Sequence, residues 1–143
     1  MNPRVTFYDV APDARLALVS KLADAAWRRS KPMLIHTADP AEAKAVDNHL
    51  WTFREEAFVP HEIAGEGPLS DPEAKIVIVT QESRPIEASI LVQLTPVSPA
   101  FAQVFAAIID IVDHRDDTRL TASRERFKAW RALGVTPTYK KSV

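Results

Sequence analysis

The sequence contains no cysteine. Disulfide bonds, iron–sulfur clusters, thiolate zinc sites and thiol nucleophiles are therefore excluded, because each of them needs a cysteine sulfur. The redox enzymes that depend on such groups are excluded with them. A chain without cysteine suits a reducing compartment, so the expected location is the cytoplasm.

Long apolar runs are missing as well. Apolar runs such as residues 106–109, within 104–109, and 76–79 are far below the roughly 20 residues that a membrane-spanning helix needs. The N-terminal segment MNPRVTFYD lacks the apolar region and the small-residue cleavage site of a secretory signal. We therefore expect a cytoplasmic protein with no membrane partner.

Glycine is scarce, with three residues in the whole chain. The first expected turn from strand to helix, residues 9–13, has none, so its backbone lacks the close approach to a pyrophosphate that a G-x-G-x-x-G turn allows. Segment 65–68, GEGP, contains a G-x-G, but no helix follows it and Glu66 would repel a phosphate. The sequence therefore predicts no nucleotide cofactor.

Motifs of metal binding and catalysis are also absent. The four histidines show neither H-x-x-x-H nor H-E-x-x-H spacing. His114 lies beside Asp113, Asp116 and Asp117, but acids in a turn between helices are typical capping groups. No G-x-S-x-G segment is present. We expect no metal, no cofactor and no active site.

What is present fits one α/β domain over residues 1–143. The chain has 143 residues, 46% of them hydrophobic, which is enough for one core. Strand and helix patterns alternate in the order β-α-β-α-β-β-α-α, which predicts three layers with helices on both faces of a mostly parallel sheet. The expected strands are 5–10, 33–37, 76–79 and 90–94, and the expected helices are 12–29, 40–51, 100–112 and 118–133.

Charge is unevenly distributed along the chain. From Thr118 to the end there are seven basic side chains against one acidic side chain, a net charge of +6. The preceding residues carry 11 basic and 18 acidic side chains, a net charge of -7. A basic C-terminal element on an acidic body indicates either a solvated helix face or a local anionic partner.

Aromatic and basic residues lie together in the last expected helix. Phe127 and Trp130 share a face with Leu120, while Arg124 precedes Phe127 by three residues. One interpretation is a core with a solvated basic rim. The other is an aromatic-floored groove with a cationic rim, suited to an acidic peptide that ends in a hydrophobic side chain and a carboxylate.

A second aromatic cluster lies at the end of the expected helix 40–51 and in the loop that follows. It contains Trp51, Phe53 and Phe58 within eight residues. An irregular segment does not readily bury three large aromatic rings. The cluster is therefore either a small separate part of the core or an exposed patch that binds a protein partner.

These segments together resemble the chi subunit of bacterial DNA polymerase III holoenzyme, an accessory protein of the clamp loader. The likeness covers nearly the whole chain, and the combination of its pieces is specific. It includes the N-terminal strand 5–8, the helix end Trp27-Arg28 and the stretch 29–31. It also includes Leu50-Trp51, the stretches 58–61 and 64–68, and the helix segment 124–131 before Gly134.

The resemblance implies a non-catalytic subunit with a Rossmann-like fold that holds no nucleotide, working in DNA replication in the cytoplasm at the nucleoid. It implies contact with the psi subunit of the clamp loader and with the acidic C-terminal tail of single-stranded-DNA-binding protein, and with DNA only through these proteins. The implied tail-binding residues are Val112, Arg124, Phe127, Lys128 and Arg131. The implied psi-binding residues are Trp51, Phe58, Val59 and Pro60.

The sequence departs from the family pattern in one site residue. Chi subunits commonly have a tyrosine at the position of Phe127. The phenylalanine keeps the ring stacking but lacks the hydroxyl group that could form a hydrogen bond. Residues 113–115 also replace a more apolar stretch that contains proline.

Two hypotheses from other functional classes stay open at this point. One is a small nucleotide- or phosphate-using enzyme with His61, Glu62 and Glu66 as acid–base groups, whose site should lie at the carboxyl ends of adjacent strands. The other is direct binding of single-stranded DNA by the last helix, which predicts an affinity that falls steeply with salt.

Overall fold

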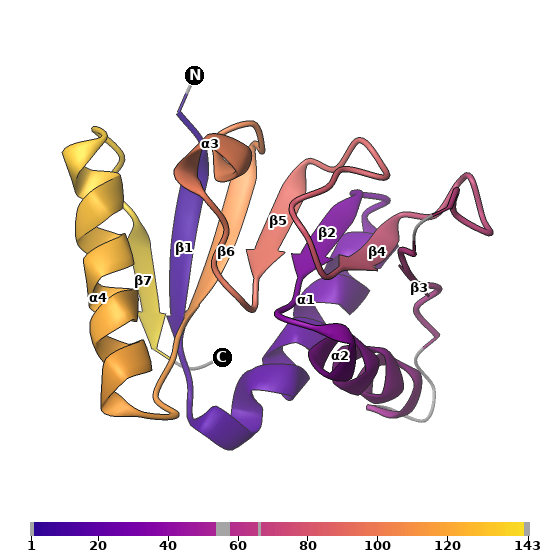
Figure 1. Cartoon of the computed structure of the whole chain (residues 1–143), viewed down its shortest axis with the longest axis horizontal. Coiled ribbons are helices and arrows are strands. Elements are labelled where there is room, and N and C mark those ends of the chain that lie inside the picture. Colours follow the sequence, from indigo (N-terminus) through magenta and orange to yellow (C-terminus); the bar gives the residue numbers. More distant parts are fainter. Residues whose placement is uncertain (1, 54–57, 66, 142–143) are drawn as a thin grey trace.

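The computed structural model describes residues 2–53, 58–65 and 67–141 of the chain. Its centre is one sheet of seven parallel strands in the order β3-β4-β2-β5-β6-β1-β7 (Figure 1). Strands β3 and β7 therefore form the two edges of the sheet. The strands are β1 (Arg4–Asp9), β2 (Met33–His36), β3 (Glu62–Ile63), β4 (Ile76–Val79), β5 (Ile90–Gln93), β6 (Ala107–Val112) and β7 (Thr138–Lys141).

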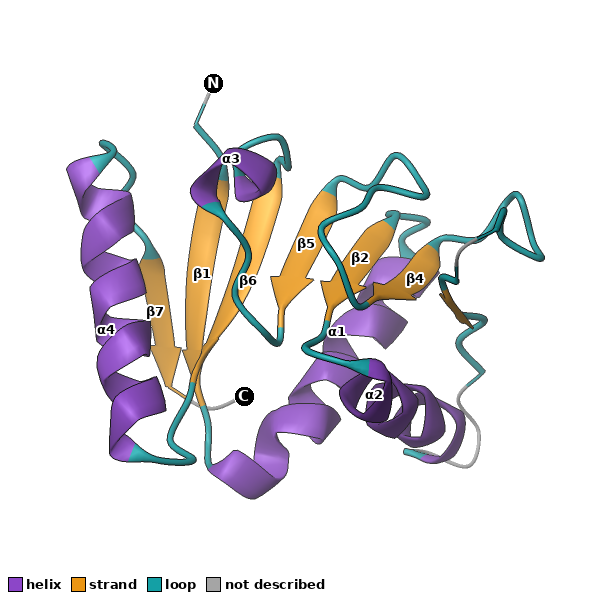
Figure 2. Cartoon of the chain, viewed as in Figure 1, coloured by secondary structure: helices purple, strands orange, loops and turns teal. Residues whose placement is uncertain are grey.

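Helices cover both faces of this sheet (Figure 2). Helices α1 (Arg15–Arg28) and α2 (Pro40–Thr52) pack on one face, with a short 3-10 turn at Pro12–Ala14 before α1. Helices α3 (Pro99–Ala102) and α4 (Asp117–Ala132) pack on the other face. The predicted three-layer α/β architecture is confirmed.

The core has two parts because the central strands are buried on both faces. Met33, Ile35 and Val92 pack toward α1 and α2. Leu34, Leu91 and Phe7 pack toward α3 and α4. Alternate side chains along one strand thus enter different clusters, as the twofold repeat of a β-strand requires.

The predicted helix over 100–112 is wrong. Residues Pro99–Ala102 form one helical turn, α3, and Ala107–Val112 form the central strand β6. The three- and four-residue spacing of apolar side chains there has another cause. A strand between β5 and β1 is apolar on both faces, and a short run of that kind is ambiguous between helix and strand.

The helix ends follow the predicted signals. The Asp39 carboxylate accepts a hydrogen bond from the Glu42 backbone N–H at 2.8 Å and so caps α2, with Pro40 in its first turn. The Glu42 side chain reaches back to the Ala38 N–H at 2.8 Å. After α4, Gly134 adopts a φ of 83°, a left-handed backbone that suits glycine.

Candidate functional site

A cavity of about 250 Å³ lies between α4, the ends of β1 and β6, and β7; we call it the α4 cavity. It brings together three of the residues that the resemblance to the chi subunit implies for tail binding, Val112, Arg124 and Phe127. Lys128 and Arg131 are exposed on α4 and do not line it. The other lining residues are Phe7, Asp9, His114, Leu120, Ser123 and Tyr139.

Aromatic rings form the apolar wall of the α4 cavity. The rings of Phe7 and Phe127 meet edge to face, with centroids 5.2 Å apart and planes inclined by 65°. Phe7 is fully buried in the strand, whereas Phe127 is half-buried. The exposed part of the Phe127 ring is thus held in one orientation and can accept an apolar side chain.

Arg124 supplies an available cation at this wall. Its side chain is exposed, and no described residue forms an ion pair with it. Lys128, one helical turn further along α4, lies 3.8 Å from the Glu125 carboxylate in a solvent-exposed pair. A guanidinium without a partner beside an apolar wall is suited to bind a carboxylate with two parallel hydrogen bonds.

Asp9, which no sequence pattern indicated as a site residue, lines the same cavity. Its carboxylate accepts hydrogen bonds from the Tyr139 hydroxyl and from His114 Nε2, the latter at 2.5 Å. Burial favours a higher pKa for Asp9, but these two bonds and the charges of His114 and Lys141 together lower it. His114 thus pairs with an acid of β1, and the described residues contain no cluster of three or more metal-ligating side chains.

The second predicted surface is an exposed pair of aromatic rings, Trp51 and Phe58, which we call the aromatic patch. Their side chains are 47% and 67% exposed, and their ring centroids lie 5.8 Å apart. Pro60 is half-buried beside them. Val59 is fully buried in the core below, so it supports the patch and offers no surface of its own.

His61 supports the aromatic patch from inside. Its ring lies 4.3 Å from the Trp51 ring, between centroids. Nδ1 lies 2.7 Å from the Val59 carbonyl oxygen, and Nε2 lies 2.8 Å from the Asp47 carboxylate. These contacts connect the loop after α2 to the helix and fix the orientation of Trp51.

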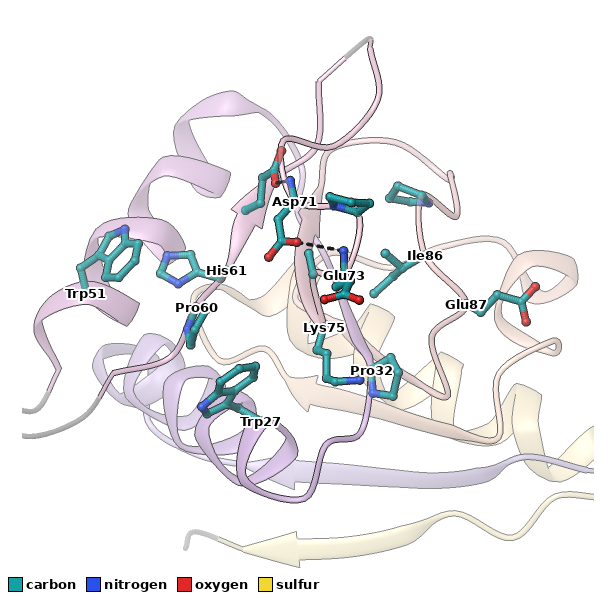
Figure 3. A pocket seen from close by; sticks show the side chains of 14 residues that line it. Trp27, Pro32, Trp51, Pro60, His61, Asp71, Glu73, Lys75, Ile86 and Glu87 are labelled. Atoms are coloured by element: carbon teal, nitrogen blue, oxygen red, sulfur yellow. Dashed lines mark hydrogen bonds between the residues drawn. The ribbon is translucent and has the colours of Figure 1, made fainter.

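A groove of about 780 Å³ continues from the aromatic patch (Figure 3). Trp27, Trp51 and His61 line one side of it, and Lys75 and Glu87 lie on the loops opposite. Pro32 and Lys75 directly precede β2 and β4, so the groove lies at the amino ends of these strands.

The position of this groove contradicts the hypothesis of an enzyme that uses His61 and Glu62 at the carboxyl ends of strands. Both side chains also have structural partners. Glu62 accepts hydrogen bonds from the backbone N–H groups of Ser70 and Asp71, and His61 contacts Val59 and Asp47. Glu66, the third residue of that hypothesis, lies outside the described residues.

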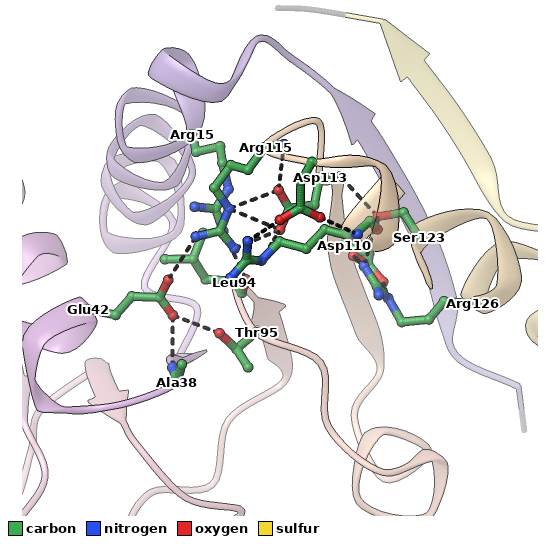
Figure 4. Close-up of polar contacts among 12 residues, drawn as sticks. Arg15, Ala38, Glu42, Leu94, Thr95, Asp110, Asp113, Arg115, Ser123 and Arg126 are labelled. Atoms are coloured by element: carbon green, nitrogen blue, oxygen red, sulfur yellow. Dashed lines mark hydrogen bonds and ion pairs between the residues drawn. The ribbon is translucent and has the colours of Figure 1, made fainter. Parts of the chain in front are cut away.

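The carboxyl ends of β5 and β6 carry a buried polar network instead (Figure 4). Asp110 on β6 is fully buried, and Arg126 of α4 holds both of its oxygens, at 2.7 and 2.9 Å. Gln93 of β5 donates to the same carboxylate at 3.2 Å. Burial raises the pKa of Asp110, and Arg126 opposes this effect.

Asp113, just beyond β6, forms a second charged group at this edge (Figure 4). The Arg115 guanidinium donates to both carboxylate oxygens, at 2.6 to 3.2 Å. Arg15 is buried nearby and donates to the Leu94 carbonyl at 3.1 Å. In dinucleotide-binding folds the cofactor lies at this edge of the sheet, whereas here charged side chains of the chain itself are buried there.

Acid is expected to weaken the fold through Asp113. Although burial opposes it, the Arg115 guanidinium lowers the pKa of this carboxyl from 3.8 to about 2. A lowered pKa means that the ionised carboxylate stabilises the fold above about pH 4 by about 2 kcal/mol, and that this contribution is lost as the pH falls toward 2. Urea unfolding of the wild type and of Asp113→Asn, measured from pH 7 to pH 2.5, should show a difference that shrinks with acid. A difference in the free energy of unfolding that stays constant over this pH range would contradict a lowered pKa of Asp113.

The fold places the chain among the parallel α/β proteins whose sheet is covered on both faces. It superposes on the crystal structure of T4 UvsW with a TM-score of 0.68 and 8% sequence identity, over 97% of this chain and 41% of that one. At such low identity the likeness concerns the fold alone. The structure describes no helix that is both long and apolar enough to cross a membrane.

Sequence comparison identifies the family. Residues 2–138 match the model of the family described as DNA polymerase III chi subunit, HolC. The chain is 34% identical over 134 residues to DNA polymerase III subunit chi of Pseudomonas aeruginosa, covering 92% of this chain and 91% of that protein. It is 36% identical over 126 residues to subunit chi of Escherichia coli, covering 86% and 84%. The chain therefore belongs to the chi subunit family, whose members are accessory subunits of the replicative DNA polymerase III.

Proposed function

We propose that this chi-family subunit links the polymerase complex to the acidic C-terminal tail of single-stranded-DNA-binding protein. The observation that supports this most is the meeting of Val112, Arg124 and Phe127 around the α4 cavity. Phe127 and Val112 accept the last apolar side chain of the tail, and Arg124 binds its terminal carboxylate. Lys128 and Arg131, outside the cavity, attract the acidic residues that precede it.

The tail peptide is expected to bind with micromolar affinity, about -8 kcal/mol, because a flexible peptide loses conformational entropy when it is ordered. Calorimetry with the tail peptide of the host's single-stranded-DNA-binding protein tests this. A second peptide without the last residue should bind at least about tenfold more weakly, since it loses the buried apolar side chain. Equal binding of the two peptides would show that the α4 cavity is not the site.

Raised salt should weaken the complete peptide through screening of Lys128 and Arg131. Plain single-stranded DNA without a protein partner is the control. If DNA bound as tightly as the peptide, direct DNA binding by α4 would become the better explanation.

We further propose that the aromatic patch holds the psi subunit of the clamp loader. Trp51 and Phe58 are exposed, in mutual contact and supported by the rigid His61 ring below. Large aromatic side chains of this kind commonly provide most of the binding energy of a protein interface. Pro60 extends the patch, and the buried Val59 keeps the loop in place.

Phe58→Ala is expected to weaken psi binding by about 2 kcal/mol, because it removes an exposed aromatic anchor. Co-purification and titration with psi measure this effect at equal concentrations of folded protein. Leu133→Ala is a control, since Leu133 is 51% exposed on the far side of the molecule, at the end of α4. If Phe58→Ala retained wild-type affinity, the aromatic patch would have only a structural role. Binding of the tail peptide should be the same in both variants.

No catalytic step is assigned to this subunit. His61 and Glu62, the two side chains of the enzyme hypothesis that the structure describes, have structural partners, and the carboxyl ends of β5 and β6 hold buried ion pairs. We propose that the subunit acts by binding alone, in the cytoplasm at the nucleoid, and reaches DNA through its protein partners.

A further inference from the structure

Strand β7 has one free edge. It pairs with β1 on one side, and no described strand pairs with its other side (Figure 1). All four of its residues, Thr138–Lys141, are exposed. The edge of a sheet presents unpaired backbone N–H and C=O groups, which form a template for another extended segment.

The same strand forms a wall of the α4 cavity. Tyr139 lines the cavity and lies opposite Phe7 in the ladder between β7 and β1, while Lys141 lies opposite Asp9. Phe7 and Asp9 also line the cavity. A peptide that leaves the cavity on this side therefore meets β7 first.

Strand β7 carries two exposed lysines, Lys140 and Lys141. Neither Lys140 nor Lys141 forms an ion pair with a described residue, although the charge of Lys141 helps to lower the pKa of Asp9. The Lys140 ammonium lies 5.8 Å from the centroid of the Tyr8 ring. Lysines on an edge strand normally prevent pairing with the edges of other sheets. Toward an acidic segment the same charges are attractive, so this edge favours an acidic strand over a neutral or basic one.

We propose that the acidic tail peptide adds to the sheet as a further strand on β7, with its last residues in the α4 cavity. This inference rests on the proposed function and adds the conformation of the bound peptide. Backbone hydrogen bonds to β7 contribute affinity that does not depend on the order of the acidic residues. The α4 cavity contributes the preference for a free carboxyl end.

Two N-methylated tail peptides test the proposal. One carries N-methyl groups on alternate residues upstream of the last two, and the other carries them on the intervening residues. In a strand, alternate N–H groups point to opposite sides, so only one of the two sets faces β7. Calorimetry should show about a tenfold loss of affinity for one peptide and a loss below about threefold for the other, because only the inward N–H groups form hydrogen bonds.

The outcomes separate this proposal from the proposed function. If both methylated peptides bind like the parent peptide, or if both lose affinity equally, strand addition is wrong while tail binding in the α4 cavity stands. If the parent peptide itself does not bind, both proposals fail. Hydrogen exchange gives an independent measurement, since strand addition should slow exchange at β7 amides that point outward in the free protein. Unchanged exchange throughout Thr138–Lys141 at saturating peptide would overturn the proposal.

Discussion

Replacing Arg124 by alanine is expected to weaken binding of the acidic tail peptide by about thirtyfold, or about 2 kcal/mol. Arg124 is the exposed cation on the wall of the α4 cavity, beside the Phe127 ring. Its loss leaves the terminal carboxylate of the peptide in contact with an apolar surface and with Asp9. Calorimetry at constant salt measures the change directly.

Two further variants make this prediction specific. Arg124→Lys keeps the charge but replaces the planar guanidinium, so it should lie between the wild type and Arg124→Ala in affinity. Arg4→Ala removes an exposed guanidinium at the start of β1, away from the α4 cavity, and should leave the affinity within about twofold of the wild type. If Arg124→Ala behaved like Arg4→Ala, the basic face of α4 would be merely solvated.

Arg126→Ala is expected to produce the largest loss of folding stability, about 3 to 5 kcal/mol. The Asp110 carboxylate is fully buried and depends on Arg126 for both of its oxygens. Without the guanidinium, a buried charge has only Gln93 as a side-chain partner. Urea or guanidinium unfolding measures the difference in the free energy of unfolding.

The pH dependence of this loss provides a second check. Burial raises the pKa of Asp110, and removal of Arg126 raises it further, so protonation of the carboxyl relieves the unpaired charge in the variant. The difference between Arg126→Ala and the wild type should therefore shrink at acid pH. Arg131→Ala, an exposed arginine on the same helix, should change stability by less than about 0.5 kcal/mol. A similarly small effect of Arg126→Ala would mean that the buried ion pair contributes little.

Local signals allowed much of the fold to be predicted. The caps of α2 and the glycine after α4 lie where the sequence places them, because a capping carboxylate and a left-handed glycine act over a few residues. The helix predicted over 100–112 was wrong, because strand β6 is buried on both faces and the spacing of its apolar residues happens to match that of a helix. Strand β7 was not predicted, because its four exposed residues have no alternating apolar pattern.

The candidate site was also predictable only where its residues are close together in the sequence. Arg124 and Phe127 lie one turn apart on a helix, so their neighbourhood follows from sequence spacing. Asp9 and Tyr139 are 130 residues apart and meet only because β1 and β7 pair. The order of the strands in the sheet determines this contact, so no local pattern in the sequence could predict it. The resemblance to the chi family also indicated Val112, which the spacing of the last helix does not reach.

The order of the strands also determines the distance between the aromatic patch and the α4 cavity. Strand β3, next to α2 and its aromatic patch, and strand β7, next to the α4 cavity, are the outermost of seven strands. Six intervals of 4.8 Å separate such strands by about 29 Å. Two proteins anchored at these two places could bind at the same time, because neither would cover the site of the other. The width of the sheet thus makes the subunit a spacer that would hold its two proposed partners in one complex without any contact between them.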